Sequence, residues 1–236
     1  MRIFVTPAEL VAGELAVRGD EHHYLTRVRR VRVGDAVELV DGCGRRAAAT
    51  IARIDAQATT VVAVPAADIE PVPPRLRALI PLIKGDRMDV CLEKLVEVGV
   101  DEIVVWPAAR AVVKLDGERL AGRIAKYREM VRAAARQSGR ARVPGVSAAE
   151  ALAAAAAGDG LRLVLDPASE TPLAAALGAS PTELTLITGP EGGFSPGERE
   201  QLAAAGFVGI GLGPRVLRAE TAPVVAVAVI RALTAS

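Results

Sequence analysis

The 236-residue sequence has few cysteines, few aromatic residues and no long hydrophobic run. Its two cysteines, Cys43 and Cys91, are far apart and lack CxxC spacing, which argues against a zinc site or a disulfide framework. The strictly apolar stretch at residues 222–230 is nine residues long, whereas a membrane-spanning helix needs about 20. Glu9 lies where a signal peptide would have its apolar core. We therefore expect a cytoplasmic protein with no membrane span and no metal.

The total charge hides an uneven distribution. The chain has 29 Lys and Arg against 28 Asp and Glu, a net charge of +1. Residues 110–142 nevertheless contain ten basic and three acidic residues, a local charge of +7. A second basic cluster at residues 27–32 follows the only two histidines. Either cluster alone could be a solvated surface, but together they predict an RNA-binding protein, because clustered cations bind phosphates by releasing counterions. The candidate RNA contacts are His22, Arg27, Arg30, Arg136, Gln137 and Arg140.

The first 70 residues read as a small β-barrel, because short apolar runs alternate with turn signals. One short helix is expected within residues 22–30, where apolar side chains have helical spacing. Residues 66–75 contain three prolines and form the best linker. The expected strands cover residues 2–6, 14–18, 36–40, 47–54 and 59–64.

Beyond the linker, apolar runs alternate with amphipathic segments, which predicts an α/β domain over residues 75–236 with a mainly parallel sheet. Asp86 is the expected N-cap of one helix, and Ser195 with Glu198 predicts a capping box with Pro196 at the first helical position. The expected strands cover residues 76–83, 102–106, 161–165, 184–188 and 207–212, and the expected helices residues 86–98, 118–137, 148–157, 196–205 and 220–233.

Three loops follow strands in the last third of the chain, at residues 166–167, 188–198 and 211–221. Ligands of open parallel sheets bind beyond the carboxyl ends of the strands, so these loops are the candidate site. The glycines of the 188–198 loop allow a ligand to approach the backbone, although a tight strand-to-helix turn would also use them. The 188–198 loop is not a phosphate-binding P-loop, because no Gly-Lys-Ser/Thr follows it. The glycines at 209, 211 and 213 do not form a dinucleotide-binding fingerprint, because the third glycine has the wrong spacing.

Four segments in order, residues 84–100, 135–144, 188–198 and 211–221, resemble the 16S ribosomal RNA uridine-N3 methyltransferases. This family belongs to the SPOUT class, and residues 22–42 are similar to its PUA-like RNA-binding barrel. The resemblance implies a PUA-like domain over residues 1–70 and a deep trefoil knot at about residues 161–236. It also implies a homodimer that uses S-adenosyl-L-methionine to methylate N3 of uridine 1498 in the 16S rRNA of the 30S subunit. One departure is Arg136, where the family pattern has an acidic residue.

The resemblance also implies site residues. Arg218 would stabilise the deprotonated uridine, and Glu220 or Glu191 would accept its proton or position the base. Two alternatives remain open, a SPOUT enzyme with another RNA target and a non-catalytic RNA-binding protein. The cofactor residues it implies are Leu165, Thr188, Gly189, Pro190, Glu191, Gly192, Gly193, Leu212, Gly213, Val216, Leu217 and Arg218.

Overall fold

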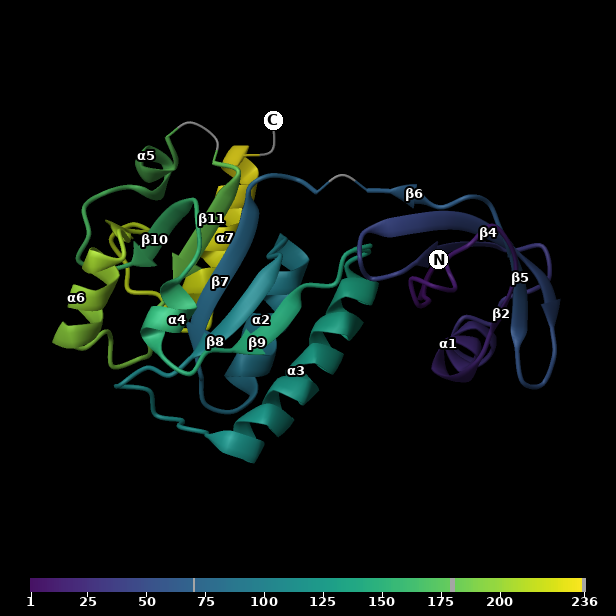
Figure 1. The fold of residues 1–236 in the computed structure, drawn as a ribbon, viewed down its shortest axis with the longest axis horizontal. Coiled ribbons are helices and arrows are strands. Elements are labelled where there is room, and N and C mark those ends of the chain that lie inside the picture. Colours follow the sequence, from purple (N-terminus) through teal and green to yellow (C-terminus); the bar gives the residue numbers. More distant parts are fainter. Residues whose placement is uncertain (70, 179–180, 235–236) are drawn as a thin grey trace. The chain divides into compact units, whose positions relative to one another are not determined.

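The structure is a computed structural model that describes residues 1–69, 71–178 and 181–234 (Figure 1). The chain forms two compact units. The first contains Met1–Pro71 together with Ala135–Val143, and the second contains Val72–Ala134 and Pro144–Ser236. The sequence did not indicate that residues 135–143 return to the first unit, and the domains predicted at 1–70 and 75–236 remain a prediction.

The first unit is built around one β-sheet with the strand order β1-β3-β4-β5-β2, and β6 pairs with β4. The β1–β3 pair is parallel, and the other pairs are antiparallel. Its core contains the fully buried side chains of Ile3, Leu25, Leu39 and Val61. The strands are β1 (Arg2–Phe4), β2 (Gly13–Val17), β3 (Ala36–Val40), β4 (Arg45–Ile54), β5 (Thr59–Ala63) and β6 (Ala67–Asp68).

A short helix between β2 and β3 was predicted and is present, although it begins earlier than expected. Helix α1 (Gly19–His23) continues directly into the π-helix η1 (Tyr24–Val28). The helix therefore begins at Gly19, before the predicted range of residues 22–30. Leu25 points into the core, whereas Arg30 is exposed and has a φ of 51°, which is uncommon for a residue with a side chain.

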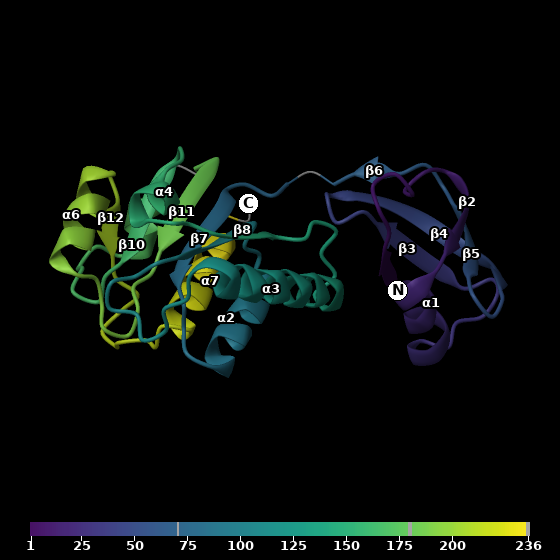
Figure 2. The same ribbon diagram turned by 60° about the horizontal axis from the view of Figure 1, so that its bottom comes forward.

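The second unit contains a six-stranded parallel sheet in the order β12-β10-β11-β7-β8-β9. Figures 1 and 2 show α2 and α7 on one face of this sheet and α4 and α6 on the other. The strands are β7 (Arg75–Pro81), β8 (Glu102–Trp106), β9 (Gly145–Ala148), β10 (Leu161–Leu165), β11 (Glu183–Ile187) and β12 (Val208–Ile210). The helices are α2 (Asp86–Val98), α3 (Gly117–Gln137), α4 (Leu152–Ala156), α5 (Leu173–Leu177), α6 (Pro196–Ala204) and α7 (Thr221–Thr234).

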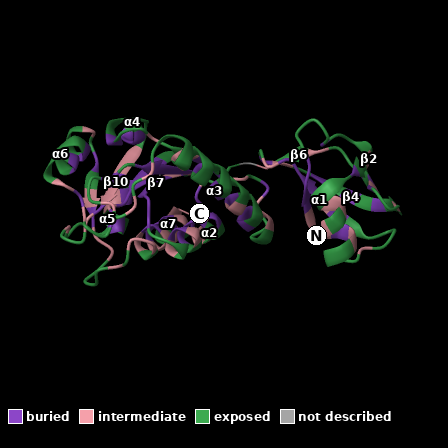
Figure 3. Cartoon of the chain, turned by 90° about the horizontal axis from the view of Figure 1, so that it is seen from below, coloured by how far each residue is buried: buried purple, intermediate pink, exposed green. Residues whose placement is uncertain are grey.

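Helix α3 has the amphipathic pattern that the sequence predicted. Ile124, Tyr127 and Val131 are buried, while Arg119 and Arg123 are exposed, and Figure 3 shows the exposed outer side of this helix. None of the described helices is both long enough and apolar enough to cross a membrane.

Some predicted elements differ from the structure. Residues 145–148 form strand β9, which was not predicted, and the helix predicted at 148–157 covers only α4 (Leu152–Ala156). The prediction that Asp86 caps α2 was wrong, because Gly85 occupies the N-cap with a φ of 66° and Asp86 is already helical. The short elements α5 and β6 were not predicted.

Arg231 near the end of α7 connects this helix to the start of the sheet. Its guanidinium donates to the carbonyl oxygens of Val72, Pro74 and Gly99 at 2.7–2.9 Å. It also pairs with Asp101, with 2.6 Å between Nη2 and Oδ2. Such a set of bonds uses the fork-like donor geometry of arginine. The position of α7 is therefore fixed at its carboxyl end.

The predicted capping box at the start of α6 is present, and it has an additional partner. Glu198 Oε2 accepts a hydrogen bond from the Ser195 amide at 2.7 Å, and Oε1 accepts one from the Ala109 amide at 2.7 Å. Burial alone would raise the pKa of Glu198, but these amide hydrogen bonds lower it on balance. One buried carboxylate thus connects α6 to the loop after β8.

We predict that Glu198→Gln lowers the free energy of unfolding at pH 7 by about 1–2 kcal/mol, because the neutral amide replaces an acceptor oxygen by a donor. The contribution of Glu198 is present above its ordinary pKa and is lost as the pH falls through the lowered value. The difference between wild type and variant should therefore shrink in acid. Urea unfolding at pH 7 and pH 3.5 measures it. Glu200→Gln, at an exposed position of the same helix, is the control.

Candidate functional site

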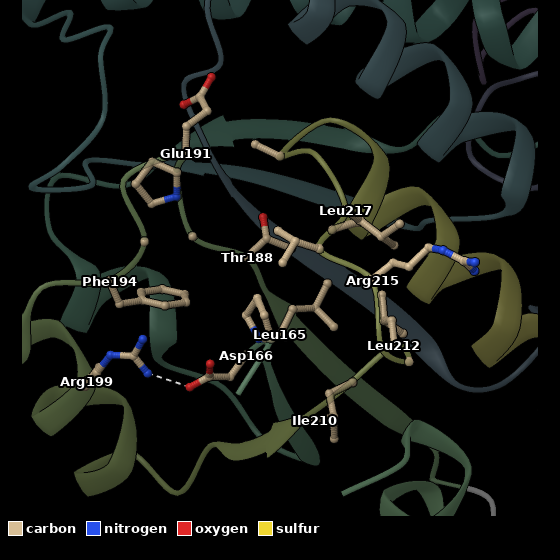
Figure 4. Close-up of a pocket in the computed structure, with 18 residues that line it drawn as sticks. Leu165, Asp166, Thr188, Glu191, Phe194, Arg199, Ile210, Leu212, Arg215 and Leu217 are labelled. Carbon is tan, nitrogen blue, oxygen red and sulfur yellow. Dashed lines mark hydrogen bonds and ion pairs between the residues drawn. The ribbon is translucent and has the colours of Figure 1, made fainter. Parts of the chain in front are cut away.

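A cavity lies beyond the carboxyl ends of three neighbouring strands. Strand β10 pairs in parallel with β11 on one side and β12 on the other, so all three end at the same edge of the sheet. The cavity has a volume of about 190 Å³ and is lined by the loops that follow these strands (Figure 4). A cavity therefore lies where the three loops meet.

The walls of the cavity are largely apolar. Leu165 contributes its side chain from the end of β10, and Leu212 and Leu217 contribute theirs from the loop after β12. Phe194 closes one side and stacks on Trp106, with 5.8 Å between the ring centroids. Trp106 in turn donates from Nε1 to the carbonyl oxygen of Thr188 at 3.2 Å, which fixes the loop after β11. These aromatic contacts hold one wall in place before any ligand binds.

Two polar groups stand out among these walls. The Thr188 side chain is buried, and its Oγ1 has no hydrogen-bond partner. Asp166 pairs with Arg199, with 2.5 Å between Oδ2 and Nη1 (Figure 4). Burial raises the pKa of Asp166, but the Ala168 amide and Arg199 lower it on balance. Asp166 is therefore a carboxylate with its charge compensated, whereas the Thr188 hydroxyl keeps unused hydrogen-bonding capacity.

Close backbone packing explains one glycine of the loop after β12. A Cβ on Gly211 would lie 2.4 Å from the carbonyl oxygen of Ser169. The Gly211 amide donates to Thr171, and the Ser169 hydroxyl donates to the Gly209 carbonyl. The loops after β10 and β12 thus pack backbone against backbone.

Most of the predicted cofactor residues line this cavity, but two of them do not. Gly192 packs instead against Arg110, whose Nη1 donates to the Gly192 carbonyl at 3.2 Å, and the Arg218 side chain is 79% exposed. The sequence prediction omitted eight lining residues. Position in a loop after a strand was the available signal for Asp166, Pro167, Phe194, Arg215 and Ala219, whereas Arg199 in α6, Ile210 in β12 and Ala222 in α7 offered no such signal. The predicted residues that line the cavity are Leu165, Thr188, Gly189, Pro190, Glu191, Gly193, Leu212, Gly213, Val216 and Leu217.

The two predicted catalytic carboxylates, Glu191 and Glu220, share a partner that the sequence did not reveal. Arg87, in the first turn of α2, pairs with Glu191 at 3.1 Å and more loosely with Glu220 at 3.7 Å. Arg218 lies 3.9 Å from Glu220. The Glu220 side chain is 13% exposed, so this carboxylate is set back from solvent. Arg87 lies within residues 84–100, one of the four segments that resemble the family, and this was the only sequence signal that it belongs to the site.

The predicted RNA contacts fall into two groups. Arg27, Arg30 and Gln137 are exposed. His22 instead contacts Thr59, with 2.9 Å between Nδ1 and Oγ1, and Arg140 is half-buried. Arg136 pairs with Glu21 and lies over the rings of Phe4 and Tyr24, at 5.7 and 5.2 Å from their centroids. Arg136 therefore fastens residues 135–143 to the first unit.

The described part of the chain contains no group of three or more His, Cys, Asp or Glu side chains placed to hold a metal ion. Of the two cysteines, Cys43 is exposed and Cys91 is buried. Burial, and secondarily the charge of Glu220, raise the pKa of Cys91 to about 12, so this thiol stays protonated at neutral pH.

The fold is that of an RNA methyltransferase. Residues 70–231 match the RNA methyltransferase domain family, and residues 17–63 match the RNA methyltransferase PUA domain. The chain belongs to the family of ribosomal RNA small subunit methyltransferase E, the family that the sequence resembles.

Three relatives illustrate the match. Ribosomal RNA small subunit methyltransferase E from Mycobacterium bovis is 36% identical over 228 residues, covering 92% of this chain and 86% of the relative. The Bacillus subtilis protein of that name is 27% identical, covering 93% and 90%. The crystal structure of the Neisseria gonorrhoeae protein of that name, bound to S-adenosyl methionine, is 28% identical with a TM-score of 0.87, covering 98% of this chain and 97% of that one.

We predict that Gly211→Ala destabilises the protein by about 2–3 kcal/mol, because the added methyl group must displace the Ser169 backbone. Thermal or urea unfolding measures the effect. Gly197→Ala in α6 is the matched control, since a Cβ there meets nothing within 4 Å. This control should be neutral or stabilising by about 0.4–1 kcal/mol. Equal stability of the two variants would contradict the packing described at Gly211.

Proposed function

We propose that this protein transfers a methyl group from S-adenosylmethionine to N3 of uridine 1498 in 16S rRNA. The observation that carries the proposal is the cavity beyond β10, β11 and β12, where ten of the twelve residues implied for cofactor binding meet. Family membership supports the reaction class. The base atom and the position in the rRNA rest on the sequence resemblance.

The residues of the cavity fit S-adenosylmethionine. Apolar walls from Leu165, Leu212 and Leu217 suit an adenine ring. The buried Thr188 hydroxyl has no partner in the protein and can bond a polar edge of the ligand. Gly213, with a φ of 101°, leaves open space where a side chain would project. We propose that these loops hold the cofactor chiefly through backbone and apolar contacts.

S-adenosylmethionine supplies an electrophilic methyl group. Uridine N3 carries a proton at neutral pH, so the protein must accept that proton or stabilise the uridine anion. We propose that Arg218, whose side chain is exposed beside the cavity loops, stabilises the negative oxygens of the base. Glu191 or Glu220 accepts the proton. The target base must leave its stack to reach the cavity, as in other enzymes that modify a base.

We propose that RNA binds to the basic side chains that remain exposed. Arg27 and Arg30 on and after η1 are exposed in the first unit. In the second unit, Arg119, Arg123 and Lys126 are exposed along α3. Such contacts act mainly on phosphates, so they position the RNA and make binding sensitive to salt.

The family resemblance further implies a cytoplasmic homodimer with a trefoil knot, and we retain these as proposals. In support, α7 is apolar on several sides and exposes Leu233 at 50% and Val229 at 37%. A second copy of the chain would cover these side chains. For the knot, support comes from the loops after β10 and β12, which already pack closely at Gly211 and Ser169.

The experiment is methylation of 30S subunits from a strain that lacks this modification, with labelled S-adenosylmethionine and nucleoside analysis of the digested 16S rRNA. We expect label in 3-methyluridine, in a fragment that contains position 1498. Label on another base atom or position would support a SPOUT enzyme with a different target. Binding to RNA without binding of S-adenosylmethionine in calorimetry would support a non-catalytic RNA-binding protein.

We predict that Thr188→Val weakens S-adenosylmethionine binding about fivefold, the effect of one lost neutral hydrogen bond of about 1 kcal/mol. Stability should be unchanged or higher, because the hydroxyl that is removed is buried without a partner. Calorimetry and thermal unfolding measure the two effects separately. Thr185→Val is the control, because Thr185 is also buried at 5% exposure but does not line the cavity. If the Thr188 variant and wild type bound S-adenosylmethionine with equal affinity, this hydroxyl would not contact the cofactor.

A further inference from the structure

The structure joins two loops of the proposed site through one side chain that belongs to neither. Arg87 lies in the first turn of α2, yet its guanidinium faces both Glu191, after β11, and Glu220, before α7. The Nη2–Oε1 separation is 3.1 Å for Glu191, and the Nη1–Oε2 separation is 3.7 Å for Glu220. A single cation is therefore shared between two carboxylates from separate parts of the chain.

Burial makes this arrangement stronger than an ordinary surface ion pair. Exposed ion pairs contribute little to stability, and Arg87 is itself 40% exposed. Glu220, however, is only 13% exposed, and its Oε2 has no hydrogen-bond partner. Removing Arg87 would leave this carboxylate with Arg218 alone, at 3.9 Å from an exposed side chain. A charge left in that position should displace the start of α7.

The Cys91 thiol is consistent with a Glu220 carboxylate close to α2. This thiol is one helical turn beyond Arg87 on α2, and its raised pKa has Glu220 as the second cause after burial. Glu220 is absent from the cavity lining, whereas Glu191 is present there. A carboxylate at residue 220 is already favourable, because a negative charge at the amino end of α7 interacts with the helix dipole. This interaction does not explain why Arg87 also reaches Glu191.

We propose that Arg87 is a positioning residue of the methyltransferase site, which holds the loop after β11 and the start of α7 together through Glu191 and Glu220. This inference rests on the function proposed above. On this reading Glu220 acts through Arg87 and not as the proton acceptor, which leaves Glu191 as the carboxylate at the cavity. Arg87 then sets the affinity for S-adenosylmethionine by keeping the two loops in their binding arrangement.

The first test compares S-adenosylmethionine binding by calorimetry in wild type, Arg87→Met and Arg87→Lys. Methionine keeps most of the side-chain length without the charge, and we expect the Kd to rise about fivefold or more. Lysine should restore part of the affinity, because it keeps the charge but cannot span both carboxylates. Arg75→Met is the matched control, since Arg75 pairs with Glu102 at 3.3 Å at the amino ends of the strands. A Kd for Arg87→Met within twofold of wild type would overturn the proposal.

The second test asks whether Arg87 and Glu220 act together. Glu220→Gln should also raise the Kd, and the double variant Arg87→Met/Glu220→Gln should bind no more weakly than Arg87→Met alone. If Glu220 were instead the proton acceptor, Glu220→Gln would lower kcat and leave the Kd unchanged. Multiplicative losses in the double variant would likewise contradict a shared role.

The third measurement needs no cofactor. In the ligand-free protein, amide hydrogen exchange of residues 189–193 and 218–222 should be faster in Arg87→Met than in wild type, while the Arg75→Met control stays unchanged. Unchanged exchange in both loops would contradict the proposal. The methylation assay on wild type tests the proposed reaction separately from the role of Arg87. If 30S methylation occurs at another atom but Arg87→Met still weakens cofactor binding and speeds loop exchange, only the proposed reaction fails. If 3-methyluridine forms but Arg87→Met changes neither cofactor affinity nor loop exchange, only the proposed role of Arg87 fails.

Discussion

The parallel pairing of β10 with both β11 and β12 is the constraint on which the candidate site depends. It brings three loops that are far apart in the sequence to one edge of the sheet. The Asp166 amide donates to the Ile210 carbonyl, which continues the β10–β12 pairing past the strand end into the cavity lining. Because backbone and apolar side chains form most of the cavity, its shape depends on this edge more than on any single polar residue.

Further contacts keep that edge in place from outside the cavity. Arg231 fixes the carboxyl end of α7 to the backbone around β7 and β8, while Arg87 faces Glu220 near the other end of this helix. On the opposite face, Glu198 ties α6 to the Ala109 amide, and Trp106 stacks on Phe194. The site is thus supported on both faces of the sheet, as a binding site that relies on a fixed backbone requires.

The alternation of strands and helices and the three loops were predictable, because apolar period and glycine content are local signals. The missed features are those that local signals cannot carry. Gly145–Ala148 has no long apolar run, and it becomes a strand only by pairing with β8. Gly85 rather than Asp86 caps α2 because the chain there needs a positive φ. The reach of Arg87 to two loops depends on tertiary structure alone.

Tertiary contacts also decide which basic residues can bind RNA. A cluster of arginines in the sequence predicts a phosphate-binding surface only if the side chains remain available. Arg136 is instead used by Glu21, Phe4 and Tyr24, and Arg128 donates to the Val146 carbonyl. The surface proposed for RNA is therefore narrower than the local charge of +7 suggests. It consists of the exposed basic side chains of α3 together with Arg27 and Arg30 in the first unit. The positive φ of Arg30 is a backbone strain of the kind that is often found at functional positions.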